Sequence, residues 1–197
     1  MHEMGTGARP VAGLRTGRVS YRTASDAALV RAAQAGSEEA VEALFARHWP
    51  DVYRAAYLVA RDRAAAEDIA QEAFLAAVRA LGRFDRRRPL CPWLHRIVVN
   101  RAIDWSRARA LRREVGVEGI AELPAAADAF GDPFDGRMAG ALAELSPEHR
   151  AVVVLRYLLE YTPGEIARAL DIPRGTVNSR LRRALDALSN VLGDETR

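Results

Sequence analysis

The sequence predicts an all-α protein in which two small helical domains are joined by a flexible acidic linker. Apolar residues recur at helical spacing along most of residues 25–192, and the frequent Ala favours helices. The charge also changes sign abruptly, from a net +8 over residues 83–113 to eight acids against one Arg over residues 114–148. Finally, residues 162–188 have the pattern of two helices joined by a short turn.

Length and composition limit the class of protein. The 197 residues are enough for one large domain or two small ones. The formal net charge is +3, from 29 basic and 26 acidic side chains, and every basic side chain is Arg. The single Cys excludes an internal disulfide and fits a reducing compartment. No apolar run approaches the ~18 residues that a membrane span needs, so we expect a cytoplasmic protein.

The N-terminal third is expected to begin with a disordered tail over residues 1–24, which holds five Gly or Pro and shows no apolar periodicity. Ser25 then caps a helix that stops at Gly36, and Ser37 caps the next one. Pro50 lies inside this second pattern and predicts a kink or a restart.

A third helix is predicted from Ala64 to Leu81, ended by Gly82. Its apolar residues share one face, which leaves a cluster of acidic and polar side chains on another. This α3 cluster, as we call it below, comprises Glu67, Asp68, Gln71 and Glu72.

The segment from Arg83 to Arg113 is strongly basic, with ten Arg against two Asp. It reads as a loop followed by a helix that Pro92 opens, with Phe84, Trp93 and Trp105 among the Arg residues. Basic residues with aromatics are typical of single-stranded nucleic-acid binding, because bases stack on rings and phosphates pair with guanidinium groups. The alternative is a set of core aromatics beside a solvated charged face, above all for Trp93.

Residues 114–136 form the acidic linker, rich in Pro, Gly and Ala, and residues 137–192 form the second domain. A helix is predicted from near Asp135 to just before Ser146. Ser146 and Pro147 then cap a strongly apolar helix. Residues 193–197 are a short C-terminal tail.

A helix-turn-helix pattern follows. Thr162 and Glu165 form a capping box for a helix to about Leu170, and a second helix begins at Pro173. Asp171 holds the turn position that Gly usually occupies, and it tolerates left-handed backbone better than most residues. The second helix has four Arg and no acid over residues 174–183, as expected of a helix in a DNA major groove. The alternative is an ordinary amphipathic hairpin with a solvated basic face.

The order of these segments resembles the extracytoplasmic-function class of bacterial RNA polymerase sigma factors. The resemblance covers residues 26–113 and 138–192. Four stretches carry it, namely LFARHWPDVYRAAY (44–57), AEDIAQEAFLAAVRAL (66–81), PWLHRIVVNRAID (92–104) and LSPEHRAVVVLRYLLEYTPGEIARALDIPRGTVNSRLRRAL (145–185).

The resemblance implies that residues 25–113 are region 2, which binds the polymerase clamp and melts the −10 element. Residues 137–192 would be region 4, which reads the −35 duplex. The implied partners are core RNA polymerase, through the clamp of its largest subunit, and promoter DNA, both duplex and single-stranded. Whether an anti-sigma factor also binds is left open.

Carried over residue by residue, the resemblance assigns core-polymerase binding to the α3 cluster. Phe84 and Asn100 match positions that line the pocket for a flipped −10 base, and stacking plus amide hydrogen bonds suit an extruded base. The full −10 set is Phe84, Arg88, Trp93, Arg96, Asn100, Arg101 and Asp104. The −35 set is Arg174, Thr176, Asn178, Ser179, Arg182 and Arg183.

Two other classes of function compete with this interpretation. A plain duplex-binding regulator would explain the helix-turn-helix but not the α3 cluster or the basic, aromatic segment. An enzyme could use Cys91 and His95, which are one helical turn apart, as a thiolate or metal site. A zinc site needs three or four ligands, however, and His48 and His149 belong to other segments. We therefore expect a non-enzymatic protein without cofactor or metal, in which Cys91 is dispensable.

Overall fold

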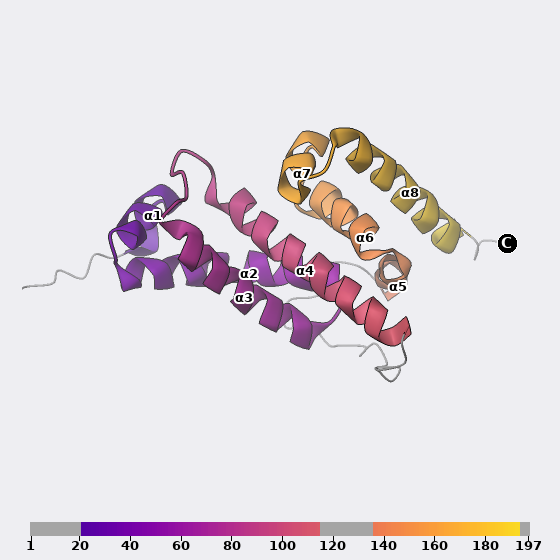
Figure 1. Cartoon of the computed structure of the whole chain (residues 1–197), viewed down its shortest axis with the longest axis horizontal. Helices are drawn as coiled ribbons and strands as arrows, with labels where there is room; N and C mark the ends of the chain where they lie inside the picture. The colour runs from indigo at the N-terminus through magenta and orange to yellow at the C-terminus, as the bar shows by residue number, and fades with distance from the viewer. Residues whose placement is uncertain (1–20, 115–135, 194–197) are drawn as a thin grey trace, which may run out of the picture.

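The computed structural model describes residues 21–114 and 136–193, and these form two helical bundles that pack side by side (Figure 1). The N-terminal bundle comprises η1 to α4 and the C-terminal bundle α5 to α8. Three predicted segments lie wholly or largely outside the described residues. They are the N-terminal tail up to residue 20, the acidic linker over residues 115–135 and the C-terminal tail from residue 194. No described helix is both long enough and apolar enough to cross a membrane.

The N-terminal bundle follows the predicted order of helices. Its elements are η1 (Tyr21–Thr23), α1 (Asp26–Gln34), α2 (Glu38–Ala60), α3 (Arg63–Leu81) and α4 (Leu90–Glu114). Ser25, Ser37 and Asp62 cap α1, α2 and α3, each accepting a hydrogen bond from the backbone amide three residues on. These caps satisfy amides that would otherwise have no intrahelical partner.

Two features of this bundle differ from the sequence prediction. Of the kink or restart predicted at Pro50, the restart is wrong, because α2 runs through Pro50 from Glu38 to Ala60 as one helix. Proline inside a helix costs about 3 kcal/mol, but α2 lies at the centre of the bundle and packs against α1, α3 and α4. Burial of that long face, from Leu44 to Val59, outweighs the local cost. The fourth helix begins at Leu90 rather than at Pro92, because burial of Leu90 against the bundle adds the preceding turn.

The C-terminal bundle consists of α5 (Gly136–Glu144), α6 (Pro147–Val153), which continues as the π-helical η2 (Val154–Leu158), α7 (Pro163–Leu170) and α8 (Arg174–Gly193). The predicted capping box is confirmed: Glu165 accepts from the Thr162 amide at 2.8 Å, and Thr162 Oγ1 accepts from the Glu165 amide. Asp171 adopts the left-handed conformation, with φ of 53°, that the turn between α7 and α8 requires.

One continuous apolar core joins the two bundles. Val98 and Val99 of α4 belong to the same buried cluster as Val152, Leu155 and Ile166 of the C-terminal bundle. The helices that meet are α4 and α2 on one side and α6, η2 and α7 on the other. The molecule therefore holds its two DNA-binding candidates, α4 and α8, on opposite sides of α6 and α7 (Figure 1).

Candidate nucleic-acid interface

The predicted −35 residues lie together on the N-terminal half of α8. Arg174, Asn178, Arg182 and Arg183 are exposed, whereas Thr176 and Ser179 are half-buried. The opposite face of α8 is anchored on the other helices of its bundle through Val177, Leu181, Ala184 and Leu188. Within the described residues, the guanidinium groups of Arg174, Arg182 and Arg183 form no hydrogen bond or ion pair, so they are available to a ligand.

The α3 cluster is also accessible. All four of its side chains are exposed on α3. Gln71 Nε2 donates to Glu67 Oε1 at 3.4 Å, and Arg101 of α4 pairs with Glu72 Oε2 at 2.5 Å. Arg101 was predicted to bind −10 DNA, so this ion pair joins the predicted polymerase surface to the predicted −10 surface.

The predicted −10 residues have more varied surroundings. Arg88, Arg96 and Asp104 are exposed, whereas Trp93, Asn100 and Arg101 are half-buried. Phe84 is only 8% exposed, and its ring centroid lies 4.7 Å from that of Trp93. This is the position that the core-aromatic alternative predicted, and a base could stack on the Phe84 ring only after this packing opened.

The C-terminal bundle covers part of the −10 set. Asn100 Nδ2 donates to the backbone oxygen of Ala169 in α7 at 3.1 Å. Next to this contact, an open cavity of about 430 Å³ lies between α4 and α7, and Trp93 and Arg96 face Glu165 and Arg168 across it. The amide that would hydrogen-bond a flipped base is therefore already occupied by a protein carbonyl.

Two further polar contacts close the interface between the bundles. His95 Nδ1 lies 2.9 Å from Tyr161 Oη, and burial lowers the pKa of His95, so the ring is neutral near physiological pH. Burial, with smaller contributions from Cys91 and Glu165, raises the pKa of Tyr161.

At the other end of α4, Arg107 Nε donates to Glu148 Oε1 of α6. Burial alone would raise the pKa of Glu148, but the hydrogen bond from Arg107 and the other favourable contacts lower it.

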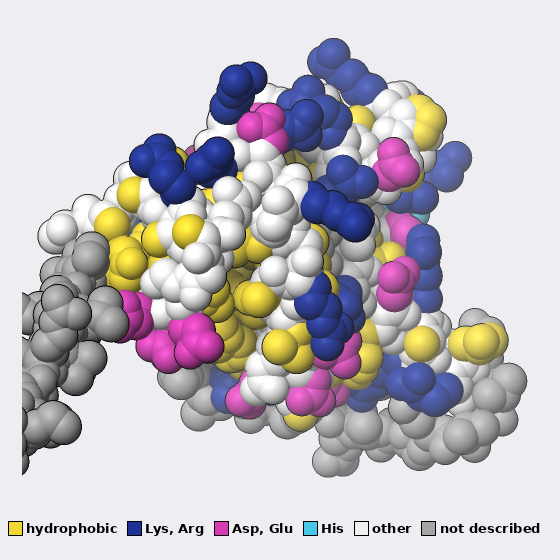
Figure 2. All heavy atoms as spheres, turned by 60° about the vertical axis from the view of Figure 1, so that its left-hand side comes forward, with side chains coloured by type: hydrophobic (Ala, Val, Ile, Leu, Met, Phe, Trp, Pro, Cys, Tyr) yellow, Lys and Arg dark blue, Asp and Glu magenta, His cyan; other side chains and the backbone are white. Residues whose placement is uncertain are grey.

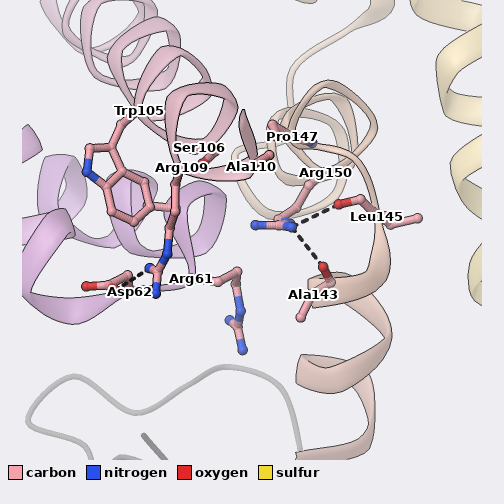
Figure 3. A pocket seen from close by; sticks show the side chains of 11 residues that line it. Arg61, Asp62, Trp105, Ser106, Arg109, Ala110, Ala143, Leu145, Pro147 and Arg150 are labelled. Carbon is pink, nitrogen blue, oxygen red and sulfur yellow. Dashed lines mark hydrogen bonds and ion pairs between the residues drawn. The ribbon is translucent and has the colours of Figure 1, made fainter. Parts of the chain in front are cut away.

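Arg150 lies inside the interface and is 7% exposed. Its guanidinium donates to three carbonyls at the end of α5, those of Leu142, Ala143 and Leu145, and to the Val59 carbonyl of α2 at 2.7 Å. Figure 3 shows this side chain at the edge of a cavity of about 230 Å³. Burial, and then the nearby charge of Arg61, lowers its pKa to about 10, so it stays a cation at neutral pH.

The opposite wall of this cavity is held by another Arg. Arg109 pairs with Asp62 at 2.5 Å, and its guanidinium lies 5.1 Å from the centroid of the Trp105 ring (Figure 3). Trp105, predicted as one of the aromatics beside the Arg residues, is half-buried and used within the protein. Figure 2 shows another face of the molecule, on which most Arg side chains lie on the upper and right-hand parts with a few acidic ones among them, other acidic side chains lie lower, and apolar atoms are exposed between them.

The sequence argument missed the residues that hold the bundles together. Arg150 had one detectable signal, a charged residue at an inward position of an apolar helix. Tyr161 and Glu148 had none, because their partners His95 and Arg107 are 66 and 41 residues away in the chain.

Comparisons with known proteins agree with this architecture. The family model "Sigma-70 region 2" matches residues 44–112, and "Sigma-70, region 4" matches residues 141–190. The ECF RNA polymerase sigma factors SigM and SigL of Mycobacterium tuberculosis are each 36% identical to this chain. The SigM match covers 86% of this chain and 85% of SigM, and the SigL match covers 89% and 95%.

Among solved structures, CnrH in complex with the cytosolic domain of CnrY is similar, with a TM-score of 0.63 and 30% identity over 87% of this chain and 99% of that one. RpoE from Bartonella quintana, solved with the anti-sigma factor NepR, shares the fold, with a TM-score of 0.62 at 23% identity over 77% of this chain and 96% of that one. Because both sigma regions match in chain order and relatives of this kind span nearly the whole chain, it belongs to the extracytoplasmic-function sigma factors of the sigma-70 family.

Proposed function

We propose that this sigma factor binds core RNA polymerase through the α3 cluster, reads the −35 duplex with α8, and recognises melted −10 DNA with the loop before α4 and α4 itself. The observation that carries the proposal is the set of exposed Arg side chains on the N-terminal half of α8, namely Arg174, Arg182 and Arg183, which have no ionic partner among the described residues. A helix that is anchored on one face and offers Arg and Asn on the other can enter a major groove. The protein would act in the cytoplasm, where the promoter DNA is.

The roles of the six −35 residues follow from their chemistry. Exposed Arg side chains can pair with phosphates or donate two hydrogen bonds to guanine, and Asn178 can pair with adenine. Thr176 and Ser179 are closer to the protein and suit phosphate contacts, since Ser179 Oγ already donates to the Thr176 carbonyl at 3.0 Å. No chemical step is required of any of these residues, which fits a non-enzymatic specificity subunit.

Recognition of −10 DNA requires a rearrangement. Asn100 is covered by α7, and Phe84 is packed on Trp93. We infer that the described arrangement is a closed form and that the C-terminal bundle leaves α4 when polymerase and promoter bind. The two bundles are covalently connected through residues 115–135, and their separation would expose the apolar core that they share.

An anti-sigma factor is a further candidate partner. CnrH, which is 30% identical to this chain, was solved with the cytosolic domain of CnrY. Here α2, α3 and α4 form an apolar groove with Phe45 and Val78 exposed at its edge, a surface that a helical partner could cover.

In vitro transcription with core polymerase, with and without this protein, tests the proposal, and start-site mapping reveals the promoter elements. The informative variant is the double charge reversal Asp68→Arg with Glu72→Arg. Both residues are exposed, so the free energy of unfolding should change by no more than about 0.5 kcal/mol. Binding to core polymerase in a pull-down, and with it transcription, should be lost.

Glu42→Arg is the matched control, because Glu42 is an exposed acid on α2, outside the α3 cluster. It should leave polymerase binding unchanged. Unaltered affinity of the double variant for core polymerase would refute the assignment of the α3 cluster.

A further inference from the structure

Four side chains that commonly bind metals meet where α2 and α4 pack together. His48 and Asp51 come from α2, and Cys91 and His95 come from the first turns of α4. The ligand atoms of His48, Asp51 and Cys91 all lie within 4.8 Å of one another. His95 Nε2 lies 3.8 Å from Cys91 Sγ. The sequence offered only the Cys91–His95 pair, and the fold supplies the other two donors.

We propose that this cluster is a zinc site, with His48, Asp51 and Cys91 as three ligands and His95 as the fourth. Zinc prefers tetrahedral sets of imidazole, thiolate and carboxylate donors, with bonds of about 2.0–2.3 Å. Donors in such a site lie about 3.3–3.8 Å apart. The separations of up to 4.8 Å among His48, Asp51 and Cys91 therefore have to shorten by about 1 Å around the ion. His95, which lies 3.8 Å from Cys91, has to turn toward the other two donors to complete the set.

His48 is the buried member of the cluster. The residue is 6% exposed. Its Nε2 lies 3.0 Å from Asp26 Oδ2, which is its ion-pair partner. Metal-bound His residues typically donate their other N–H to a carboxylate, and Asp26 is placed for that role.

The charge around the cluster also favours a cation. The negative charges of Asp51 and Asp26 both lie near the Cys91 thiol. When zinc binds, the S–H bond breaks, the zinc–sulfur bond forms and the proton leaves to solvent. The thiolate and the Asp51 carboxylate then balance the charge of the ion. Asp51 is exposed, which leaves the site a route to solvent.

His95 would connect the metal to the C-terminal bundle. With zinc on Nε2, the ring carries its proton on Nδ1, which then donates to Tyr161 Oη 2.9 Å away. Metal-bound His residues typically donate their second N–H to such an outer partner, and loss of that partner weakens metal binding about 10–100-fold. Bound zinc would therefore strengthen one of the contacts that keep the two bundles together.

The test uses the full chain without a histidine tag, stripped with a chelator and titrated with Co²⁺ as the probe, followed by competition with Zn²⁺. We expect one Co²⁺ per chain, a tetrahedral absorption spectrum with a thiolate-to-cobalt charge-transfer band, and release of about one proton per ion. Cys91→Ser should lose the charge-transfer band. His48→Ala and Asp51→Asn should weaken binding.

Tyr161→Phe should keep the charge-transfer band and bind about 10–100-fold more weakly. His149→Ala is the matched control, because His149 lies on α6 away from the cluster, and it should bind Co²⁺ as the parent does. Circular dichroism of each metal-free variant separates lost binding from lost folding, and exposed Asp51→Asn is the variant least disturbing to the fold. Absence of a thiolate band in the parent protein, or unchanged binding in Asp51→Asn and Cys91→Ser, would overturn the proposal.

Discussion

The two basic helices α4 and α8 differ in whether their predicted DNA-binding residues already contact other parts of the protein. On α8, the predicted DNA-binding Arg residues are exposed, and within the described residues they have no ionic partner. On α4, Asn100 donates to the Ala169 carbonyl, and Arg101 pairs with Glu72. Both helices were predicted to bind DNA from similar charge patterns, yet the described structure covers predicted DNA-binding residues on α4 and leaves those Arg residues of α8 exposed.

This difference suggests an order of events. Under the proposed roles, duplex recognition by α8 needs no rearrangement, whereas single-strand recognition through Asn100 needs the loss of its contact with Ala169. That contact, together with the apolar core that the two bundles share, opposes premature −10 binding. If polymerase separates the bundles, it provides the free energy that separation costs, and strand recognition becomes coupled to assembly with polymerase.

The substitution with the largest expected effect on stability is Arg150→Ala. This change leaves four buried carbonyls without their donor, at a cost of about 1–3 kcal/mol for each group that water cannot reach. We expect the free energy of unfolding to fall by about 3 kcal/mol or more, measured by urea denaturation. Among the lost contacts is the one with the Val59 carbonyl, which links α6 to α2 across the interface between the bundles.

Arg54→Ala serves as its control, because Arg54 is an exposed Arg on α2. It should change the free energy of unfolding by no more than about 0.5 kcal/mol. Equal effects of the two substitutions would show that Arg150 does not hold the bundles together.

A second prediction separates α8 from α4 by their effects on DNA. Arg182→Ala should weaken binding to a −35 duplex by about 1–3 kcal/mol, since one bidentate base contact is worth that much. Asn100→Ala should leave duplex affinity nearly unchanged and reduce open-complex formation instead. Gel shifts measure the first effect and permanganate footprinting the second.

Phe84→Ala also tests whether −10 recognition can be separated from −35 duplex binding. If the ring stacks on a base after melting, its loss should cost about 1–3 kcal/mol in open-complex stability. A template already single-stranded at −10 should restore part of the activity, because the unpairing cost is removed. A loss of duplex affinity in Asn100→Ala as severe as in Arg182→Ala would contradict the division of labour between the helices.

Much of the fold could be predicted from local sequence signals. The capping box at Thr162, the left-handed turn at Asp171 and the cap at Ser146 each depend on a few adjacent residues, and all three are present. Pro50 misled the prediction, because its local cost is real but the packing of α2 exceeds it. The site residues were placed on the correct helices, but their exposure could not be predicted.

Exposure depends on long-range packing. The family resemblance assigns Asn100 to the pocket for a −10 base, but the sequence does not show that Ala169 will lie against it. The same limit applied to Cys91, whose helix carries one potential co-ligand while the other two come from α2. Residues that lie far apart in the chain and share no periodicity leave no signal in a single sequence.

The smallest predicted effect concerns the ion pair of Arg107 with Glu148, which links the outer end of α4 to α6. Because the folded-state pKa of Glu148 lies below its ordinary value of 4.5, the pair stabilises the closed form above that pH and is lost as the pH falls through the folded pKa. Arg107 is 53% exposed, so the contribution should be only about 0.2–1 kcal/mol. Urea denaturation from about pH 7 to about pH 3 should show that the difference in free energy of unfolding between the parent protein and Glu148→Gln shrinks towards zero.

The Arg101–Glu72 pair, which lies wholly within the N-terminal bundle, is the matched control. Glu72→Gln should leave the contact between the bundles unchanged, and an equal loss of closed form in the two variants would show that the Arg107–Glu148 pair has no special part in covering α4.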